Sequence, residues 1–294
     1  MSLASKGIKM AEVSKFKRLS NHVSIPSIGL GVYQVDNKTA ERVVYQALKV
    51  GYRHFDSAQL YRNEAGVSNG IEKWLDDVPN SKRQDVFYTT KIADVSHGYE
   101  KTKKSLEKSL KTAAGLDYID LVLVHSPQSN TEKRLSTWKA LQEFVESGRV
   151  KSIGVSNYGV RHLKELLEWE GLKTRPVINQ VEINPWLLRK DLVDFCHHND
   201  IQVEAYSPLT RGRKLGDATV KRLAEKYKKD PGQILLRWSL QLQFIVIPKT
   251  VHQDRLISNF DVYDFEITDD DMALLTHPDD YGVIAGWDPV KYQG

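Results

Sequence analysis

Cysteine is almost absent from this chain of 294 residues, which contains only Cys196. A single thiol cannot form an intrachain disulfide, so we expect a reducing, cytoplasmic compartment. The segment DLVDFCHHND has helical spacing, and Cys196 falls on its apolar face. We therefore interpret Cys196 as a packing residue. A reactive thiol is the alternative, and nothing else in the sequence supports it.

Long apolar runs are also lacking. No stretch reaches the roughly 18 apolar residues that a membrane-spanning helix requires, so we expect no membrane partner. The first residues, MSLASKGIKM, do not contain the apolar core of a secretion signal. Because the sequence reads like a natural beginning from Met10 onward, we expect residues 1–9 to be a disordered or added extension. No linker rich in Pro, Gly or Ser interrupts residues 10–294, which are predicted to form one domain.

Neither sign of charge is in large excess. The chain has 42 Lys and Arg against 38 Asp and Glu, which leaves a net charge of +4. A balance this even gives no basic surface for nucleic acid, and short basic pieces such as KYKKD have the spacing of exposed helix faces. Hydrophobic residues make up 40% of the chain, which predicts a globular protein with a core.

Short apolar segments alternate with amphipathic ones along most of the chain. Eight runs rich in Val and Ile are interpreted as strands, at 29–32, 53–56, 85–91, 119–125, 150–156, 177–183, 201–207 and 244–248. Helical patterns follow them, near 38–50, 64–75, 99–113, 132–147, 159–169, 189–198, 217–229, 253–259 and 269–275. Strands that are apolar on both faces are covered on both sides. Eight strand–helix units predict an α/β fold, the closed (β/α)₈ (TIM) barrel.

A doubly wound open sheet is the alternative fold. Such a sheet usually has a glycine-rich fingerprint after its first strand, whereas GLGVYQV supplies only two glycines. Before the first barrel strand, FKRLSNHVSIPSIGL predicts a β-hairpin that turns at Ser20 and Asn21 and covers the bottom of the barrel. The last residues, HPDDYGVIAGWDPVKYQG, have no periodicity and are expected to form an irregular tail over the barrel.

Three predicted strands end in an ionisable residue: Asp56, Lys91 and His125. Tyr61 follows in the polar loop after Asp56. Barrels of this type carry their active sites at the carboxyl ends of the strands, where neighbouring strands are only about 4.8 Å apart. We therefore expect these four side chains to share one pocket. Each taken singly has an ordinary alternative, such as a helix cap, a surface lysine or a core histidine, and the hypothesis depends on the joint pattern.

These residue types suit the reduction of a carbonyl group. Tyrosine, with a pKa of about 10, is a weak acid at neutral pH. A lysine ammonium nearby lowers that pKa, and a carboxylate can hold the lysine protonated. A histidine can donate a hydrogen bond to the carbonyl oxygen. The pattern predicts Tyr61 as general acid, supported by Lys91, Asp56 and His125. It is not a metal site, because the ligand types are wrong.

The motifs DSAQLY, TTK, VHSP, GVSNY, NQVEINP, AYSPL and IPKT occur in the order found in one known family. The chain resembles the aldo-keto reductases, NADPH-dependent oxidoreductases with a (β/α)₈ barrel, and is most similar to the short members from yeasts and other fungi. The resemblance covers nearly the whole chain. It implies hydride transfer from NADPH to aldehydes, ketones or keto esters, in a protein that is a monomer, with a dimer as the alternative.

Two other functions stay open beside this one. The first is a barrel subunit that binds NADPH and a protein partner and has a regulatory role with little turnover. The second is a barrel isomerase or lyase that acts on phosphate-bearing substrates. The complete set of four polar residues favours the reductase.

The resemblance also implies roles for individual residues. Asp56, Tyr61, Lys91 and His125 correspond to the catalytic tetrad. The implied cofactor contacts are Gly31, Val32, Ser156, Asn157, Gln180, Tyr206, Ser207, Pro208, Leu209, Lys249, Thr250, Arg255 and Asn259. In this set the amides of Asn157 and Gln180 and the hydroxyl of Ser156 bind the carboxamide of the nicotinamide. Tyr206 stacks on the nicotinamide ring, and residues 207–209 run beside the pyrophosphate. Lys249, Thr250 and Arg255 bind the 2′-phosphate, and Asn259 contacts adenine.

The expected substrate pocket is lined by Tyr33, Ala58, Ile92, Ser126 and Trp287, each of which could equally be a packing residue. Trp186 is expected at the rim of this pocket. The chain departs from the family pattern at three positions. Ser126 and Tyr33 stand where many members have tryptophan, and Ser258 stands where an acidic residue often contacts adenine.

Overall fold

A closed ring of parallel strands forms the centre of the protein. The computed structural model describes residues 13–294. The strands are β3 (Leu30–Gly31), β4 (His54–Asp56), β5 (Phe87–Ile92), β6 (Ile119–Val124), β7 (Val150–Ser156), β8 (Ile178–Glu182), β9 (Gln202–Tyr206) and β10 (Ile245–Val246). Each strand pairs with its neighbour in chain order. A parallel bridge from Ile28 to Val246 joins the two ends of the sheet. The predicted (β/α)₈ barrel is confirmed, and the open-sheet alternative is wrong.

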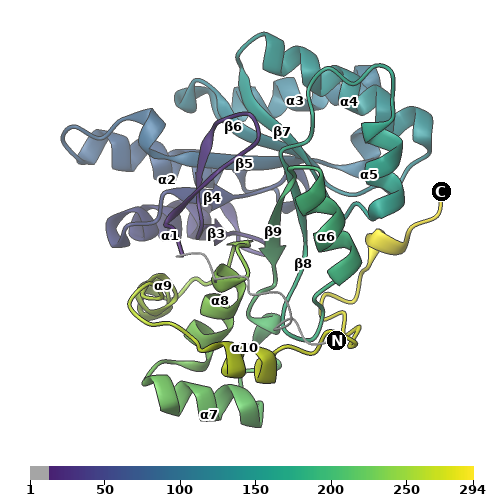
Figure 1. Ribbon diagram of the computed structural model, residues 1–294. Helices are drawn as coiled ribbons and strands as arrows, with labels where there is room; N and C mark the ends of the chain where they lie inside the picture. The colour runs from purple at the N-terminus through teal and green to yellow at the C-terminus, as the bar shows by residue number, and fades with distance from the viewer. Residues whose placement is uncertain (1–12) are drawn as a thin grey trace.

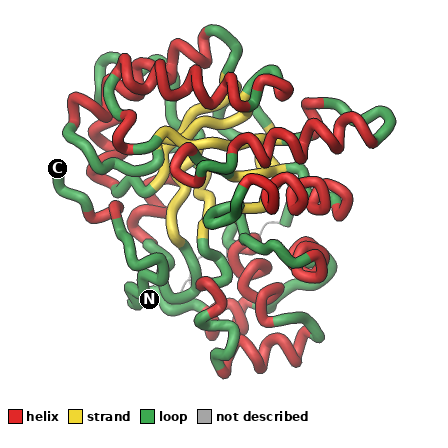
Figure 2. The backbone as a smooth tube through the Cα atoms, turned by 180° about the vertical axis from the view of Figure 1, so that it is seen from behind, coloured by secondary structure: helices red, strands yellow, loops and turns green. Residues whose placement is uncertain are grey.

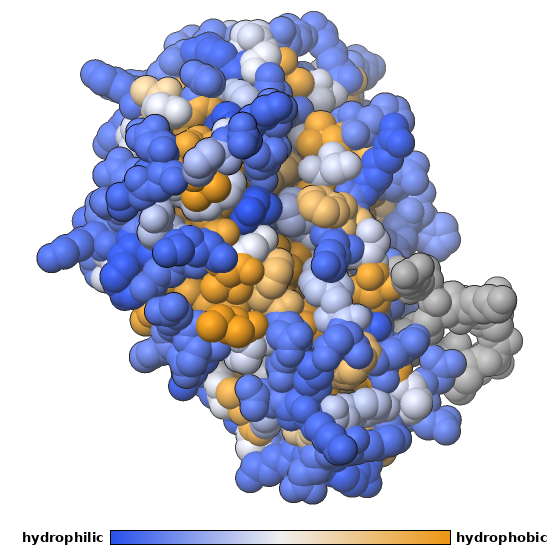
Figure 3. All heavy atoms as spheres, turned by 90° about the vertical axis from the view of Figure 1, so that its left-hand side faces the viewer, coloured by the Kyte–Doolittle hydropathy of each residue, from blue (hydrophilic) through white to orange (hydrophobic). Residues whose placement is uncertain are grey.

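Helices surround the strands on the outside (Figures 1 and 2). They are α1 (Asn37–Val50), α2 (Glu64–Asp77), α3 (Tyr99–Thr112), α4 (Thr131–Glu146), α5 (Val160–Leu167), α6 (Lys190–His198), α7 (Ala218–Tyr227), α8 (Pro231–Gln241), α9 (Gln253–Phe260) and α10 (Asp269–Leu275). Within residues 13–294, none is long and apolar enough to cross a membrane. The face shown in Figure 3 is mostly hydrophilic at its borders and gathers apolar side chains across its middle.

The first helix, α1, shows how local sequence defines these elements. The Asp36 side chain caps it by accepting a hydrogen bond from the Thr39 backbone N–H at 3.0 Å. Gly51 ends it with a φ of 125°, a conformation that favours glycine. Between these ends the apolar residues recur at helical spacing and are buried: Ala40, Val43, Val44, Ala47 and Leu48. The amphipathic spacing made this helix predictable, and the caps explain where it begins and ends.

Helix α8 has no counterpart among the predicted helices. The Asp230 backbone N–H donates to Gln233 Oε1 at 2.9 Å in a capping box, and Pro231 occupies the first turn. Every residue from Gln233 to Gln241 is buried. A helix buried on all sides has no alternation of apolar and polar faces, so periodicity could not reveal it.

The predicted hairpin is present at the bottom of the barrel. Strands β1 (Phe16–Arg18) and β2 (Ser24–Pro26) pair antiparallel. Leu19 and Ile25 are buried in a small core cluster with residues of the barrel strands: Phe87, Leu121, Leu123, Ile178 and Ile245. The hairpin therefore closes the amino-terminal ends of the strands.

The expected irregular tail is also present. Beyond α10 the chain forms only a short 3₁₀ turn at Pro289–Lys291. Glu182, the last residue of β8, accepts hydrogen bonds from the backbone N–H groups of Ile284 and Ala285 at 2.9 and 3.1 Å. This contact docks the tail at the carboxyl end of the barrel. The predicted extension at 1–9 and the domain boundary at residue 10 lie outside the described residues.

Gly66→Ala tests the packing of α1 against α2. A methyl group at Gly66 would lie 2.1 Å from the backbone oxygen of Asn37. The nearest atoms all belong to the Asn37 backbone, which cannot move aside as a flexible side chain can. Overpacking costs about 1–3 kcal/mol, and a backbone clash belongs at the upper end. This outweighs the roughly 1 kcal/mol that alanine gains over glycine in a helix. We expect a lower free energy of unfolding in urea.

Gly216→Ala is the matched control, because Gly216 lies in an exposed turn with nothing within 4 Å of the added methyl group. Its unfolding midpoint should equal that of the wild type. A Gly66 variant as stable as the wild type would contradict the tight contact between the helices.

Candidate active site

Four polar side chains meet at the carboxyl end of the barrel. Asp56 is the last residue of β4, Lys91 lies near the end of β5, and His125 follows directly after β6. Tyr61 ends a short 3₁₀ turn, Gln59–Tyr61, after β4. The structure therefore brings together Asp56, Tyr61, Lys91 and His125, which we call the tetrad.

Asp56 and Lys91 form a buried ion pair. Lys91 Nζ lies 2.6 Å from Asp56 Oδ1, and both side chains are almost fully buried. The ammonium also donates to the backbone oxygen of Ser57 at 2.8 Å. Burial opposes the charge on Lys91, but the Asp56 carboxylate and the Tyr61 hydroxyl outweigh it, so the pKa of Lys91 lies above its ordinary value. Lys91 is therefore an ammonium at neutral pH.

Tyr61 lies next to this ammonium. Its Oη is 3.4 Å from Lys91 Nζ. Burial raises the pKa of Tyr61, and the Lys91 ammonium lowers it by a smaller amount, so the net shift is upward. The lysine acts in the direction expected from the sequence, but its effect on the pKa of Tyr61 does not prevail over burial. The phenol therefore keeps its proton at neutral pH.

The His125 imidazole completes the tetrad in its neutral form. Its ring centroid is 5.6 Å from that of Tyr61, edge to face. Burial, together with the charge on Lys91, lowers the pKa of His125 to about 3. The buried Nδ1 atom has no hydrogen-bond partner within residues 13–294. A neutral imidazole here has one N–H group to donate.

Polar side chains from β7, β8 and β9 line the other side of the site. The Tyr206 hydroxyl donates to Asn157 Oδ1 at 2.9 Å, and Asn157 Nδ2 donates to the backbone oxygen of His125 at 3.0 Å. Asn157 has a φ of 61°, a left-handed conformation that asparagine tolerates. Ser156 Oγ donates to the backbone oxygen of Gln180 at 2.9 Å. Four predicted cofactor contacts thus form one connected network with the tetrad histidine.

The remaining predicted cofactor contacts lie around the same rim. The Val32 N–H donates to the Asp56 backbone oxygen at 3.1 Å, and the Gly31 N–H donates to the Pro248 oxygen at 3.0 Å. A Cβ atom at Gly31 would lie 3.1 Å from the Ile247 backbone oxygen, so this close approach needs glycine.

The segments after β9 and β10 come together near Gly232. A Cβ atom built there would be within 4 Å of Leu209 Cδ2 and of Asn259 Oδ1. Ser207 and Pro208 start the loop that leads to Leu209, and Thr250 is buried at the start of the loop before α9. Lys249 and Arg255 are exposed. Neither forms an ion pair within residues 13–294, so both are free to meet an anionic ligand.

Two aromatic residues predicted for the substrate pocket flank the tetrad. The Tyr33 ring meets the Tyr61 ring edge to face at 5.1 Å and is 44% exposed. The Trp287 ring lies 6.4 Å from His125 and is 39% exposed, and its Nε1 donates to Gln128 Oε1 at 3.1 Å. Tyr33, Tyr61, His125 and Trp287 therefore form a row of rings that is open to solvent at both ends.

Ala58, Ile92 and Ser126 are fully buried. Ser126 Oγ donates to Asp94 Oδ1 at 2.8 Å and points to that carboxylate. Trp186, expected at the pocket rim, is also buried, and its ring stacks on His277 at 5.6 Å. It supports the tail.

Residues 27–279 match the model of the aldo/keto reductase family. The chain belongs to that family. The resemblance seen in the sequence is confirmed, and the similarity extends to a fungal relative.

The chain is 47% identical over 270 residues to an uncharacterized oxidoreductase of Saccharomyces cerevisiae, over 92% of this chain and 96% of that protein. It is 41% identical over 259 residues to the glyoxal reductase of Bacillus subtilis, over 88% of this chain and 90% of that protein. A crystal structure of an aldo/keto reductase from Brucella melitensis is similar with a TM-score of 0.83 and 41% identity, over 89% of this chain and 98% of the other.

Sequence reasoning missed the residues that hold this reductase site in place. Asn63 accepts a hydrogen bond from Ser57 Oγ at 2.7 Å and donates to the backbone oxygens of Val32 and Val35 at 2.8 and 2.7 Å. It fixes the turn that carries Tyr61. An asparagine two residues after the tyrosine was the only sequence signal.

The tail that carries Trp287 has its own anchors, which were also missed. Arg189 pairs with Asp288 at 2.8 Å and donates to the Tyr281 hydroxyl at 2.6 Å. Burial raises the pKa of Glu182, and the two tail N–H groups partly oppose that shift. Arg189 and Glu182 are distant in sequence from the tail, so no local pattern could reveal this contact.

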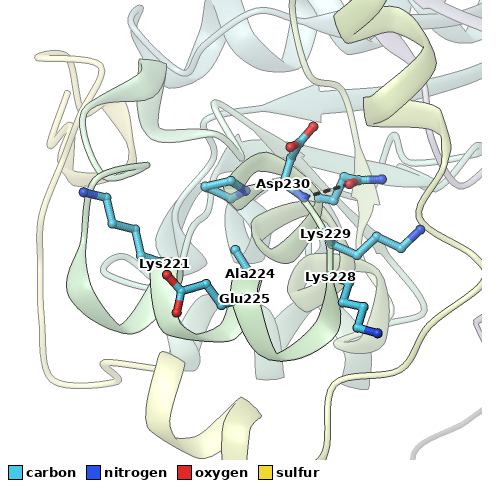
Figure 4. Close-up of a pocket in the computed structure, with 8 residues that line it drawn as sticks. Lys221, Ala224, Glu225, Lys228, Lys229 and Asp230 are labelled. Atoms are coloured by element: carbon cyan, nitrogen blue, oxygen red, sulfur yellow. Dashed lines mark hydrogen bonds between the residues drawn. The ribbon is translucent and has the colours of Figure 1, made fainter.

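The reductase also has a hollow of about 440 Å³ on the outside of the barrel, between the end of α7 and the start of α8 (Figure 4). Lys221 extends on one side of it, and Lys228 and Lys229 extend on the other. Lys229 is already paired with Asp261 and Asp264 at 2.9 and 2.7 Å. None of the tetrad lines this hollow.

Asp56→Ala should destabilise the protein strongly. It leaves the Lys91 ammonium buried without its carboxylate partner, which costs about 3–5 kcal/mol of unfolding free energy. Replacing both residues, with Asp56→Leu and Lys91→Met, removes the unpaired charge and should recover a large part of that loss. Urea unfolding of the single and double variants measures both changes.

Asp77→Ala is the control, because the Lys73–Asp77 pair is exposed on α2. Its unfolding midpoint should barely change. A double variant no more stable than Asp56→Ala would show that the loss does not come from the unpaired lysine.

Proposed function

We propose that this protein is a cytoplasmic, NADPH-dependent reductase that converts aldehydes, ketones or keto esters to alcohols. The observation that supports this most directly is the contact between Lys91, Asp56 and Tyr61, with a neutral His125 beside them. Family membership already establishes the coarser function, an oxidoreductase that acts on carbonyl groups. The identity of the cofactor and the residue roles are the proposal.

The tetrad can stabilise and protonate an oxygen that becomes negative. Tyr61 is protonated at neutral pH and donates its proton to the substrate oxygen as negative charge develops there. Lys91 stabilises the phenolate that remains, because its ammonium lies 3.4 Å from Oη. Asp56 keeps Lys91 charged, and His125 donates its N–H to orient the carbonyl oxygen. When bound, the nicotinamide supplies the hydride that reduces the carbonyl carbon.

The residues around the rim suit a dinucleotide. The Gln180 amide oxygen accepts no hydrogen bond from residues 13–294, so it can accept one from the carboxamide of a nicotinamide, together with Ser156 and Asn157. The Tyr206 ring would stack on the nicotinamide, and residues 207–209 would run beside the pyrophosphate, near Gly31 and Val32.

The outer end of the dinucleotide would lie along the segment after β10. The unpaired cations of Lys249 and Arg255, with the Thr250 hydroxyl, would bind a 2′-phosphate. Asn259 would contact the adenine. These groups favour NADPH over NADH, because NADH has no 2′-phosphate.

The pocket supports a small carbonyl substrate. The row of rings from Tyr33 to Trp287 offers apolar surface on each side of the proposed proton donor. The glyoxal reductase of Bacillus subtilis, a relative of similar length, is named for a small dialdehyde. We propose the same class of substrate for this protein. The protein would act as a monomer, without a nucleic-acid or membrane partner.

Tyr61→Phe should remove most of the activity and keep NADPH binding. Loss of a general acid lowers turnover by about 10²- to 10⁴-fold, and phenylalanine keeps the ring that packs beside Tyr33 and His125. NADPH oxidation followed by absorbance, with a panel of aldehydes and ketones, measures turnover. Fluorescence titration measures cofactor binding.

Tyr45→Phe, at a hydroxyl that bonds the exposed Asp77 on the outside of the barrel, should leave turnover unchanged. Wild-type rates in the Tyr61 variant would disprove its role as the acid. Tight NADPH binding without turnover of any carbonyl by the wild type would favour the regulatory-subunit alternative.

Arg255→Ala tests the choice of cofactor. It removes a cation proposed to bind the 2′-phosphate, so the Kd for NADPH should rise roughly tenfold. The Kd for NADH should stay the same. Arg222→Ala, an exposed cation on α7, should change neither value. An equal loss for both cofactors would place Arg255 away from the 2′-phosphate.

A further inference from the structure

A second carboxyl group is buried inside the barrel next to the tetrad. Glu204 lies in the middle of β9, in the otherwise apolar segment VEAY, and is completely buried. The chemistry proposed above does not use it. A buried carboxyl needs partners that explain its presence, because burial without them is costly.

Each oxygen of Glu204 faces one side chain, but only one of the two oxygens is hydrogen-bonded within residues 13–294. Its Oε2 accepts a hydrogen bond from Gln180 Nε2 at 2.7 Å. Its Oε1 faces His54 Nε2 at 3.5 Å and is otherwise unbonded within residues 13–294. The same histidine nitrogen is 3.4 Å from Thr89 Oγ1. Glu204 therefore joins Gln180 to His54 across the interior of the barrel.

The surroundings favour an uncharged pair. Within residues 13–294, the ionisable groups that act on Glu204 are Asp56 and His54 on β4 and Lys91 on β5. The residues next to Glu204 on the adjacent strands are uncharged: Gln180 on β8 and Ile245 on β10. Burial, and then the charge on Asp56, raise the pKa of Glu204 to about 8. Burial lowers the pKa of His54 to about 3. At pH 7 a protonated Oε1 can donate to a neutral His54 Nε2, which gives the otherwise unbonded oxygen a partner.

The same arrangement fixes the amide of Gln180. Its nitrogen donates to Asp56 Oδ2 at 2.8 Å and to Glu204 Oε2 at 2.7 Å, which uses both amide hydrogens. Because the amide group is planar, two fixed hydrogens also fix the direction of its oxygen. That oxygen is the atom we assign to the nicotinamide carboxamide.

We propose that Glu204 is a positioning residue that, as a neutral acid, orients Gln180 toward the cofactor, and that loss of its proton shifts binding toward the oxidised cofactor. The second half rests on the proposed function. A new negative charge bonded to Gln180 stabilises the positively charged oxidised nicotinamide relative to the neutral reduced one. By linkage, the ratio of the two affinities must then change with pH.

The first test measures the charge state of Glu204 without any cofactor. Glu204→Gln reproduces the neutral acid, because its amide oxygen can accept from Gln180 and its amide nitrogen can donate to His54. In the wild type the folded state keeps a proton that the unfolded state has lost above a pH of about 4.3. Wild-type stability should therefore fall relative to the variant as pH rises from about 4.5 to about 8, and then level off.

Thermal unfolding midpoints of both proteins between pH 4 and pH 9 measure this trend. Glu107→Gln, at an exposed carboxyl paired with Arg149, is the control and should follow the wild type. A Glu204→Gln variant that loses stability relative to the wild type as pH rises would mean that Glu204 is ionised in the fold. That result would overturn the proposal whatever the cofactor.

The second test measures binding of NADPH and NADP⁺ by protein fluorescence from pH 6 to pH 9.5. Both cofactors carry the same phosphates, so their titration cancels in the ratio of the two Kd values. In the wild type we expect Kd(NADPH)/Kd(NADP⁺) to rise several-fold across pH 8. In Glu204→Gln it should stay constant.

Glu64→Gln is the matched control for the second test. Glu64 is a partly buried carboxyl that accepts a hydrogen bond from Thr90 Oγ1 at 2.6 Å and does not contact Gln180. Its variant should therefore show the same change of the Kd ratio with pH as the wild type. Glu204→Leu removes the acceptor for Gln180 and should weaken binding of both cofactors about tenfold at every pH. A ratio of the two Kd values that does not change with pH in the wild type would contradict the proposal. Cofactor binding that is unchanged in Glu204→Leu would contradict it too, because both results would mean that Glu204 does not affect the cofactor. Failure of the wild type to bind either cofactor would instead overturn the proposed function, while the unfolding comparison still reports on Glu204.

Discussion

The buried ion pair of Asp56 and Lys91 is the interaction on which the site depends. A lysine in the barrel interior keeps its charge chiefly because the carboxylate lies 2.6 Å away. That charge in turn opposes the effect of burial on Tyr61 and contributes to keeping His125 neutral. This pair of charges therefore acts on both groups that would meet the substrate oxygen: it opposes burial at Tyr61 and adds to the effect of burial at His125.

Closure of the barrel makes this arrangement possible. Asp56 on β4 contacts Lys91 on the next strand, β5, but its other oxygen contacts Gln180 on β8, which is 124 residues away in the chain. Strands β5, β6 and β7 separate β4 from β8 in the sheet, so this contact crosses the interior. An open sheet would place the two residues on distant strands with no contact.

Much of the fold and the tetrad could be predicted from the sequence. Each barrel strand was expected to within about two residues, because a short apolar run between polar loops is a local signal. Asp56, Lys91 and His125 could be grouped because parallel strands all end on one side of the barrel. Helix α8 was missed because it is buried on all faces. The balance at Tyr61 was misjudged, because a lysine is visible in the sequence and burial is not.

The sequence by itself determined the order of strands and helices, the caps that bound them and the residue types at the strand ends, since all of these depend on neighbours in the chain. The tertiary structure decided which carboxyl groups share the Gln180 amide, whether Tyr61 keeps its proton, and where the tail places Trp287. These features depend on burial and on contacts between segments that are far apart in the chain, and both exist only after the barrel has closed.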